Sequence, residues 1–304
     1  MKRRIFLIYT NLKGTSSGSE GPAAVDLSHG LGYVDSSKGL LEISFDLSIP
    51  ESSEGNSEDI SQTKVKSKSK RLIKRKNVKI SAKTVEVQLF QDITSLRSRK
   101  GDTGSVVWKA SVEFAHLVLS QHHFNVENSL FDFDRLKASH ILELGSGTGL
   151  LGVLISPLSG RYTVTDIQEL VPLIQKNVTK NLPGSSNITA ESLDWIALRA
   201  SSPLQRNRLF RLDNDPDLIL VVDCIYHPSL IAPLISTLDH FAVPLKTHVL
   251  VLSELRSEDV LRDFLSSWLE IPGWKIHNVG EKLLRNRRYV MWIGVKSAAS
   301  KGLT

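Results

Sequence analysis

The pattern of apolar and polar residues divides this chain into two parts. From about residue 105 to residue 295, short continuous apolar runs alternate with stretches in which apolar residues recur every three or four positions. The first pattern predicts strands buried on both faces of a parallel sheet, and the second predicts amphipathic helices. The expected strands are 141–144, 162–166, 217–222, 247–252 and 289–295, and the expected helices are 105–120, 168–181, 258–270 and one that begins at Pro228. Strands that alternate with helices predict an α/β fold with helices on both faces of the sheet.

Before residue 90 the pattern changes to isolated strand-like pieces separated by polar segments. The strand-like pieces are 4–9, 40–47 and 84–90, and the last two alternate apolar and polar positions as half-buried antiparallel strands do. Residues 11–40 and 49–70 are rich in Ser, Gly, Lys and Glu and poor in large apolar residues, so we expect loops or disorder there. We therefore divide the chain into a small N-terminal β extension, residues 1–90, and an α/β domain, residues 91–304.

Composition excludes several classes of protein. Hydrophobic residues make up 41% of the chain, as in a folded protein, and no apolar run approaches the roughly 20 residues of a membrane-spanning helix. The apolar stretch at the N-terminus is also too short for a secretory signal. The single cysteine, Cys224, has no partner for a disulfide or a zinc cluster. We expect a monomer in the cytoplasm or the nucleus, with no membrane partner and no metal.

The excess of basic residues comes from one segment. Lys and Arg number 38 against 32 Asp and Glu, and residues 64–80 hold nine basic residues and no acidic one, which leaves a net charge of −3 elsewhere. Such a run is either a solvated insertion similar to a nuclear-localisation signal, or a contact in which Lys64 to Lys79 neutralise phosphates of RNA. The sequence favours neither interpretation.

The segment that indicates chemistry is a glycine loop at the end of the first buried strand. Gly145, Gly147 and Gly149 follow this strand where a helix begins, and Asp166 ends the next strand 21 residues after Gly145. Glycines let a backbone turn sharply and approach a ligand, and a carboxylate in that place accepts hydrogen bonds from the ribose hydroxyls of a nucleoside cofactor. The alternative is a tight strand-to-helix turn that binds nothing.

Further residues indicate which nucleoside cofactor the glycine loop would bind. A phosphate-binding Walker loop needs Lys and then Ser or Thr after its last glycine, and Leu150 and Leu151 stand there instead. The glycine spacing also differs from that of a dinucleotide loop, although a dehydrogenase stays a further option. Glu143 precedes the loop, and we expect it to place a negative charge near the ligand, which disfavours pyrophosphate and favours a sulfonium cation. The balance favours S-adenosylmethionine.

Four motifs in one order resemble a known family. They are ELGSGTGLLG at 143–152, TVTDI at 163–167, LDW at 193–195 and VVDCIY at 221–226. Together with GSVVWKAS at 104–111, they are similar to the marks of the seven-β-strand, family-16 protein lysine methyltransferases, and the resemblance covers about residues 90–295. It implies a Rossmann-like, mostly parallel sheet of seven strands, S-adenosylmethionine as cofactor, and methylation of a protein lysine, with a large-subunit ribosomal protein as substrate.

The resemblance also implies a role for each matching residue. The residues expected to bind the cofactor are Trp108, Gly145, Ser146, Gly147, Asp166, Trp195 and Val222. Trp108 would close over the cofactor, Asp166 would hold its ribose hydroxyls, and Trp195 would lie beside its adenine. Asp223 and Tyr226 are expected to be catalytic, with Asp223 orienting the lysine amine and the Tyr226 ring facing the developing cation. Core packing of the two tryptophans and a solvated Tyr226 at a strand end are the alternatives.

Other functions stay open at this point. The chain fits a methyltransferase that acts on another protein or on a small molecule. It also fits a catalytically idle scaffold that binds ribosomal components through its basic run. The complete set of Gly145, Asp166, Asp223 and Tyr226 favours an enzyme, because a scaffold has no physical need for a cofactor pocket.

Overall fold

The computed structural model of this chain describes residues 32–47, 83–94, 103–279, 283–284 and 288–298. The expected strand at 4–9, the polar segment 49–70 and the basic run from Lys64 to Lys79 lie outside these residues, as does most of segment 11–40.

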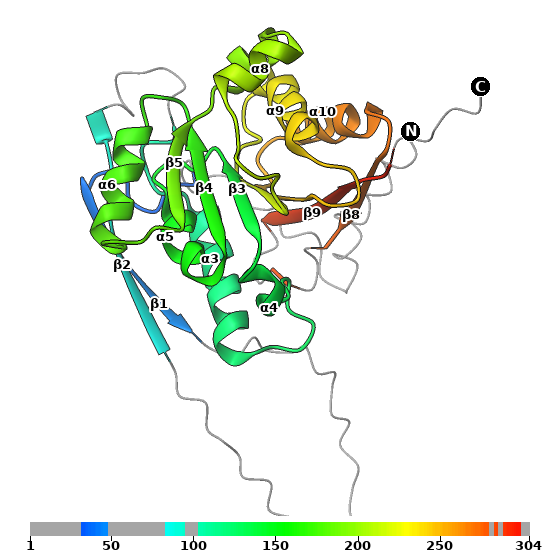
Figure 1. The fold of residues 1–304 in the computed structure, drawn as a ribbon. Helices are drawn as coiled ribbons and strands as arrows, with labels where there is room; N and C mark the ends of the chain where they lie inside the picture. Colours follow the sequence, from blue (N-terminus) through cyan, green and yellow to red (C-terminus); the bar gives the residue numbers. More distant parts are fainter. Residues whose placement is uncertain (1–31, 48–82, 95–102, 280–282, 285–287, 299–304) are drawn as a thin grey trace, which may run out of the picture.

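A seven-stranded sheet forms the centre of the α/β domain (Figure 1). Its strand order is β5-β4-β3-β6-β7-β9-β8, in which the first five strands are parallel and β9 is antiparallel to both of its neighbours. The predicted α/β fold with a mostly parallel sheet of seven strands is therefore confirmed. The strands are β3 His140–Leu144, β4 Arg161–Asp166, β5 Ile188–Ser192, β6 Leu218–Val222, β7 His248–Glu254, β8 Trp274–Asn278 and β9 Tyr289–Lys296.

Helices cover both faces of this sheet, and each face has its own apolar core. The helices on one face are α3 Lys109–Phe124, α5 Leu150–Ile155 and α6 Val171–Asn181, and those on the other are α7 Trp195–Ala200, α9 Pro228–Phe241 and α10 Glu258–Glu270. The short helices are α4 Phe133–Leu136, the 3-10 turn η2 Ser156–Leu158 and α8 Pro203–Leu209. Within β3, Ile141 contributes to the first core, and Leu142 and Leu144 contribute to the second. Burial of both faces explains the continuous apolar runs.

Two helices begin later than their sequence pattern predicts. The apolar spacing predicts a helix from Ser105, but α3 begins at Lys109. The backbone of Trp108 is extended. The backbone of Val107 binds partners outside the helix, because its N–H donates to Gln91 Oε1 at 2.7 Å and its carbonyl accepts from Val34 N at 3.0 Å. The second helix was expected from Gln168, and α6 begins at Val171, where a proline occupies the first turn.

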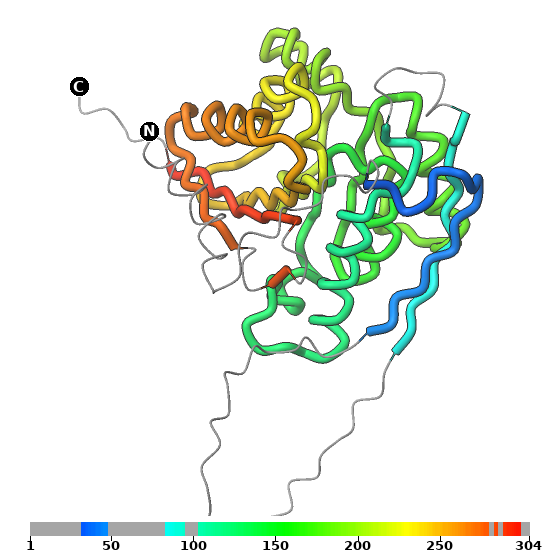
Figure 2. Tube along the Cα trace, turned by 180° about the vertical axis from the view of Figure 1, so that it is seen from behind, coloured from blue at the N-terminus to red at the C-terminus, as the bar shows by residue number. Residues whose placement is uncertain are grey.

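The N-terminal extension contains a two-stranded antiparallel hairpin, which confirms the two strands expected there. Strands β1 Leu40–Leu47 and β2 Lys83–Phe90 pair along their whole length and pack beside α3 and α6 (Figures 1 and 2). Asn177 and Asn181 of α6 bind the outer edge of β2, and each exchanges two hydrogen bonds with its backbone. The buried side chains of the hairpin belong to the same core as α3 and α5, so the extension and the α/β domain share one core.

Candidate functional site

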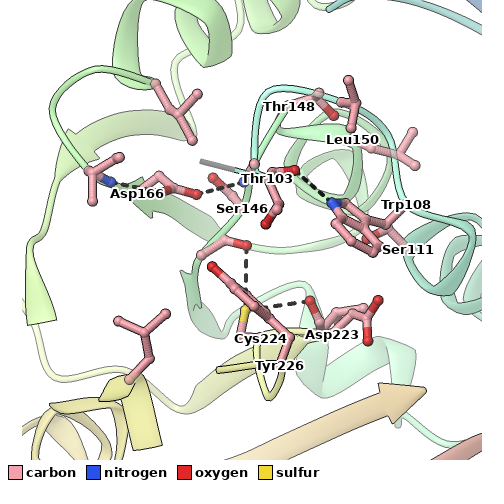
Figure 3. A pocket seen from close by; sticks show the side chains of 18 of the residues that line it. Thr103, Trp108, Ser111, Ser146, Thr148, Leu150, Asp166, Asp223, Cys224 and Tyr226 are labelled. Atoms are coloured by element: carbon pink, nitrogen blue, oxygen red, sulfur yellow. Dashed lines mark hydrogen bonds between the residues drawn. The ribbon is translucent and has the colours of Figure 1, made fainter. Parts of the chain in front are cut away.

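A cavity opens at the carboxyl ends of β3, β4 and β6, which is where the strand order reverses direction. Open parallel sheets bind their ligands at this place. The cavity has a volume of about 270 Å³, close to the lower bound of about 300 Å³ that is usual for small-molecule sites. All nine residues predicted for the site line it, namely Trp108, Gly145, Ser146, Gly147, Asp166, Trp195, Val222, Asp223 and Tyr226. Figure 3 labels Trp108, Ser146, Asp166, Asp223 and Tyr226 among them. Their individual roles stay predictions.

The glycine loop leaves β3 in a backbone conformation that requires glycine. Gly145 and Gly147 have φ angles of 69° and 58°, which residues with a side chain rarely adopt. A Cβ atom on Gly145 would lie 2.6 Å from the sulfur of Cys224, and one on Gly147 would lie 2.8 Å from the carbonyl oxygen of Gly104. The loop is therefore packed between the end of β6 on one side and the segment before α3 on the other.

The carboxylate of Asp166 fixes the loop and faces the cavity. Its Oδ2 accepts the N–H of Gly147 at 2.8 Å, and its Oδ1 accepts the N–H of Ile167 at 2.8 Å. Because a carboxylate accepts about four hydrogen bonds, we expect the same group to accept bonds from vicinal ribose hydroxyls in the cavity. The predicted ribose-binding role of Asp166 is consistent with this geometry.

The wall of the cavity also contains two buried polar atoms to which an adenosine group can hydrogen-bond. Within the described part of the chain, the buried Oγ of Ser146 and the buried Nε1 of Trp195 have no hydrogen-bond partner. Other buried side-chain atoms there, such as Nε1 of Trp268 and of Trp292, also lack a partner. Ser146 and Trp195 differ from them because they line the cavity, where a ligand can supply the partner. A nucleoside offers hydroxyl groups and ring nitrogens that suit a hydroxyl and an indole N–H.

The expectation that Glu143 places a negative charge near the ligand is wrong. Its side chain is 3% exposed, and it lies beneath the loop and not among the residues that line the cavity. Burial raises the pKa of Glu143 to about 8, and its Oε2 accepts the hydroxyl of Tyr162 at 2.8 Å. The group is therefore largely protonated near neutral pH and has a structural role under the loop.

Asp223 and Tyr226 lie together at the edge of the cavity that faces α9, but the surroundings of Asp223 differ from expectation. Asp223 follows β6 with a φ angle of 61°, and only 7% of it is exposed. Both of its oxygens are bound by the guanidinium of Arg256, and its Oδ1 also accepts the N–H of Glu254 at 3.1 Å. Sequence reasoning missed Arg256 and Glu254 because Glu254 ends β7 and Arg256 follows that strand, far along the chain from the motifs. Tyr226 is 37% exposed, and its ring borders the opening (Figure 3).

Trp108 closes the side of the cavity opposite Asp166, as Figure 3 shows. Its Nε1 donates to the carbonyl of Thr103 at 2.9 Å, which holds the segment before α3 over the loop. Its ring contacts the edge of Tyr33 at 4.5 Å between centroids, and Arg256 Cζ lies 4.5 Å from the ring centre. Thr103, Gly104 and Tyr33 were not predicted for the site. Gly104, which opens the GSVVWKAS motif, was the only signal for that segment.

Cys224 supports the glycine loop and takes no chemical role. Its buried thiol lies against Gly145, and its sulfur is 3.3 Å from the carbonyl oxygen of Leu144 and 3.5 Å from that of Val222, either of which can accept the S–H. Burial raises the pKa of the Cys224 thiol well above its usual value, so it stays a neutral packing group. Across the described ranges, no three His, Cys, Asp or Glu side chains gather as a metal site, and no helix there is long and apolar enough to cross a membrane.

Comparison with known proteins gives a consistent family assignment. The family model described as lysine methyltransferase matches residues 90–269, more than half of the chain.

Three relatives illustrate the range of similar proteins. A diaminohydroxyphosphoribosylamino-pyrimidine deaminase of Schizosaccharomyces pombe is 34% identical over 63% of this chain and 44% of its own length. An EEF1A lysine methyltransferase 3 of Xenopus tropicalis is 30% identical over 47% of this chain and 61% of its own length. A ribosomal lysine N-methyltransferase 5 of Kluyveromyces lactis is 24% identical over 73% of this chain and 83% of its own length. This chain thus spans only about half of the first two relatives.

Proposed function

The chain belongs to the lysine methyltransferase family, and from this premise we propose that it transfers a methyl group from S-adenosylmethionine to the side-chain amine of a protein lysine. One observation carries the proposal. A single cavity has the Asp166 carboxylate and the glycine loop on one side and Asp223 and Tyr226 on the other, so a nucleoside cofactor and a substrate amine can meet in it.

The residues of the chain have to position a neutral amine. S-adenosylmethionine, when bound, supplies a methyl group already activated on a sulfonium sulfur. An unperturbed lysine has a pKa of about 10.4, and only its neutral form has the lone pair that attacks. The apolar wall that Val222, Leu230 and Trp108 contribute lowers the pKa of an amine that enters the cavity. Asp223 then provides a fixed negative charge for the cation that forms, and the face of the Tyr226 ring tolerates that cation.

The mouth of the cavity supports a macromolecular substrate. Ile167, Ile196 and Tyr226 line the cavity and are 36%, 54% and 37% exposed. Large apolar side chains that surround an opening are typical of a surface that contacts another protein. We propose a large-subunit ribosomal protein as the substrate, in line with the name of the Kluyveromyces lactis relative, which matches 83% of its own length.

A different protein substrate is the second candidate. The Xenopus tropicalis relative, named for methylation of EEF1A, favours it. The deaminase activity in the name of the Schizosaccharomyces pombe relative is not proposed for this chain. Zinc-dependent base deaminases use a C-x-x-C ligand pair, and Cys224 is the only cysteine in the sequence.

Labelling of an extract tests the proposal and separates the candidates. The protein is incubated with radiolabelled S-adenosylmethionine and an extract from cells that lack the enzyme, and the labelled band is identified. A labelled lysine in a large-subunit ribosomal protein supports the proposal, and label in another protein supports the second candidate. No label, together with no cofactor binding by calorimetry at high micromolar concentration, would show an idle scaffold. Asp223→Asn is the matched control, because it keeps the side-chain shape.

We also propose that the basic run contacts RNA during this reaction, and that the protein works as a monomer in the cytoplasm, with the nucleus as the alternative. The nine basic residues in 64–80 support the RNA contact. Deletion of Lys64 to Lys79 should leave methylation of a purified protein substrate unchanged and should remove salt-sensitive binding to ribosomal RNA. Loss of activity on the purified protein would instead place the run at the active site.

A further inference from the structure

We propose that Arg256 is a positioning residue of the methyl-transfer site: its guanidinium fixes the Asp223 carboxylate at the edge of the cavity, and the N-terminal segment around Gly32 holds the guanidinium in place. The inference deepens the proposed function and rests on it. It concerns a residue that lies outside the four motifs on which the family resemblance depends.

The contact between Arg256 and Asp223 is a two-point contact. Nη1 of Arg256 donates to Oδ1 of Asp223 at 3.2 Å, and Nη2 donates to Oδ2 at 2.5 Å. Nη2 also donates to Oε2 of Glu254 at 2.7 Å. Such a planar fork fixes the orientation of a carboxylate as well as its charge, which the single point charge of a lysine does not. The side chain of Asp223 is 3% exposed, so this pair is largely shielded from solvent.

Arg256 is itself held by residues from the opposite end of the chain. Its guanidinium lies 4.5 Å from the centre of the Trp108 ring, which Tyr33 contacts from the side. Gly32 passes so close that a Cβ atom there would lie 2.6 Å from Arg256 Nη2 and 2.8 Å from Glu254 Oε2. The backbone carbonyl of Gly32 accepts the N–H of Lys109, the first residue of α3, at 2.9 Å. The extension thus forms part of the wall around the site, although the family model begins at residue 90.

The charge of this cluster suits the reaction. Asp223 and Glu254 carry two negative charges against the single positive charge of Arg256, and methyl transfer creates a cation on the substrate nitrogen. Burial raises the pKa of Asp223, and Arg256 lowers it. Among the described residues, three other titratable groups face Asp223. The charge of Glu254 raises the pKa of Asp223, and Cys224 and Tyr289 are neutral. Without Arg256, the buried carboxyl beside Glu254 would hold a proton at higher pH and would lose both its charge and its orientation.

The experiment compares Arg256→Gln with Arg256→Lys and with Arg262→Gln as the matched control. Arg262 also binds two carboxylates, Glu258 and Asp259, but on the exposed surface of α10. Arg256→Gln should lower kcat/KM at pH 7 by about a hundredfold, the scale of a lost fixed charge at a reacting centre, and change the Kd of S-adenosylmethionine by less than about threefold. The deficit should shrink as pH rises, because the Asp223 carboxyl of the variant then loses its proton. Arg256→Lys should recover part of the rate, and Arg262→Gln should match the unchanged protein.

A second measurement does not depend on activity. The Asp side-chain carboxyl carbons are labelled with carbon-13, and the signal that disappears in Asp223→Asn is followed by NMR as pH changes. The titration of this signal should move to higher pH in Arg256→Gln and should move less in Arg256→Lys. If a melting experiment shows that Arg256→Gln does not fold, the titration is measured in Arg256→Lys instead. An unchanged titration together with a constant rate ratio across pH would overturn the positioning role. If the wild-type protein methylates no substrate, the proposed function is wrong. The NMR titration still decides whether Arg256 positions Asp223.

Discussion

Replacement of Asp166 by alanine tests whether this carboxylate binds the ribose of a nucleoside in the cavity. The carboxylate is the group that we expect to bind the ribose hydroxyls, and it accepts the backbone N–H groups of Gly147 and Ile167 at 2.8 Å each. A hydrogen bond to a charged acceptor contributes about 1.5 kcal/mol or more. Two bonds to vicinal hydroxyls therefore account for about 3 kcal/mol, which corresponds to a loss of roughly 100-fold in affinity.

Calorimetric titration measures this loss directly. S-adenosylhomocysteine and its counterpart without ribose hydroxyls are titrated into the unchanged protein and into Asp166→Ala. The wild-type protein should bind S-adenosylhomocysteine roughly 100-fold more tightly than the counterpart without ribose hydroxyls. Asp166→Ala should bind both ligands with similar affinity. Asp213→Ala is the matched control, because Asp213 is 77% exposed and pairs with Arg161 at 2.8 Å, and such a surface pair contributes about 0–1 kcal/mol.

The reasoning also predicts a separate effect on folding. Asp166→Ala leaves the backbone N–H groups of Gly147 and Ile167 without their acceptor. The free energy of unfolding should therefore fall by about 1–2 kcal/mol, as measured in urea. If Asp166→Ala kept its preference for the ligand with ribose hydroxyls, the carboxylate would not be the group that holds the sugar, and the nucleoside would lie elsewhere.

Further predictions concern the substrate side of the cavity and the support of the loop. Asp223→Asn should lower methyl transfer about a hundredfold or more and leave the calorimetric Kd of the cofactor unchanged; full activity would remove Asp223 from the reaction. Burial raises the folded pKa of Glu143 from 4.5 to about 8, so the folded state keeps a proton that the unfolded chain releases. Stability should therefore fall as pH rises from about 4.5 to about 8, by at most roughly 1.4 kcal/mol per unit, and Glu143→Gln should flatten that slope in urea unfolding at several pH values. Gly145→Ala should destabilise the protein by about 1–3 kcal/mol, because the residue has a φ of 69° and its new Cβ would meet the sulfur of Cys224; unchanged thermal melting would contradict this.

The parallel core of the fold could be read from the sequence because its pattern is local. Strands such as 141–144 and 217–222 are buried on both faces, so they appear as continuous apolar runs, and the matching strands β3 and β6 begin within one residue of the expected positions. The strands that the pattern did not predict, β5 and β8, lie at the two edges of the sheet. Both strands are only partly buried and include polar residues, so ITAES and WKIHN have no continuous apolar signal.

The sequence by itself placed Gly145 and Asp166 at the cavity, and the tertiary structure decided which groups surround Asp223 and Glu143. Glycines that must adopt positive φ angles and the carboxylate at the end of the next strand lie at fixed distances along one strand-helix-strand unit, so spacing alone located Gly145 and Asp166. The protonation of Glu143 depends on burial under the loop, and the contact of Arg256 with Asp223 joins the ends of two neighbouring strands and the segment around Gly32. These interactions connect parts of the chain that are far apart in sequence, and only the packing of the folded protein brings them together.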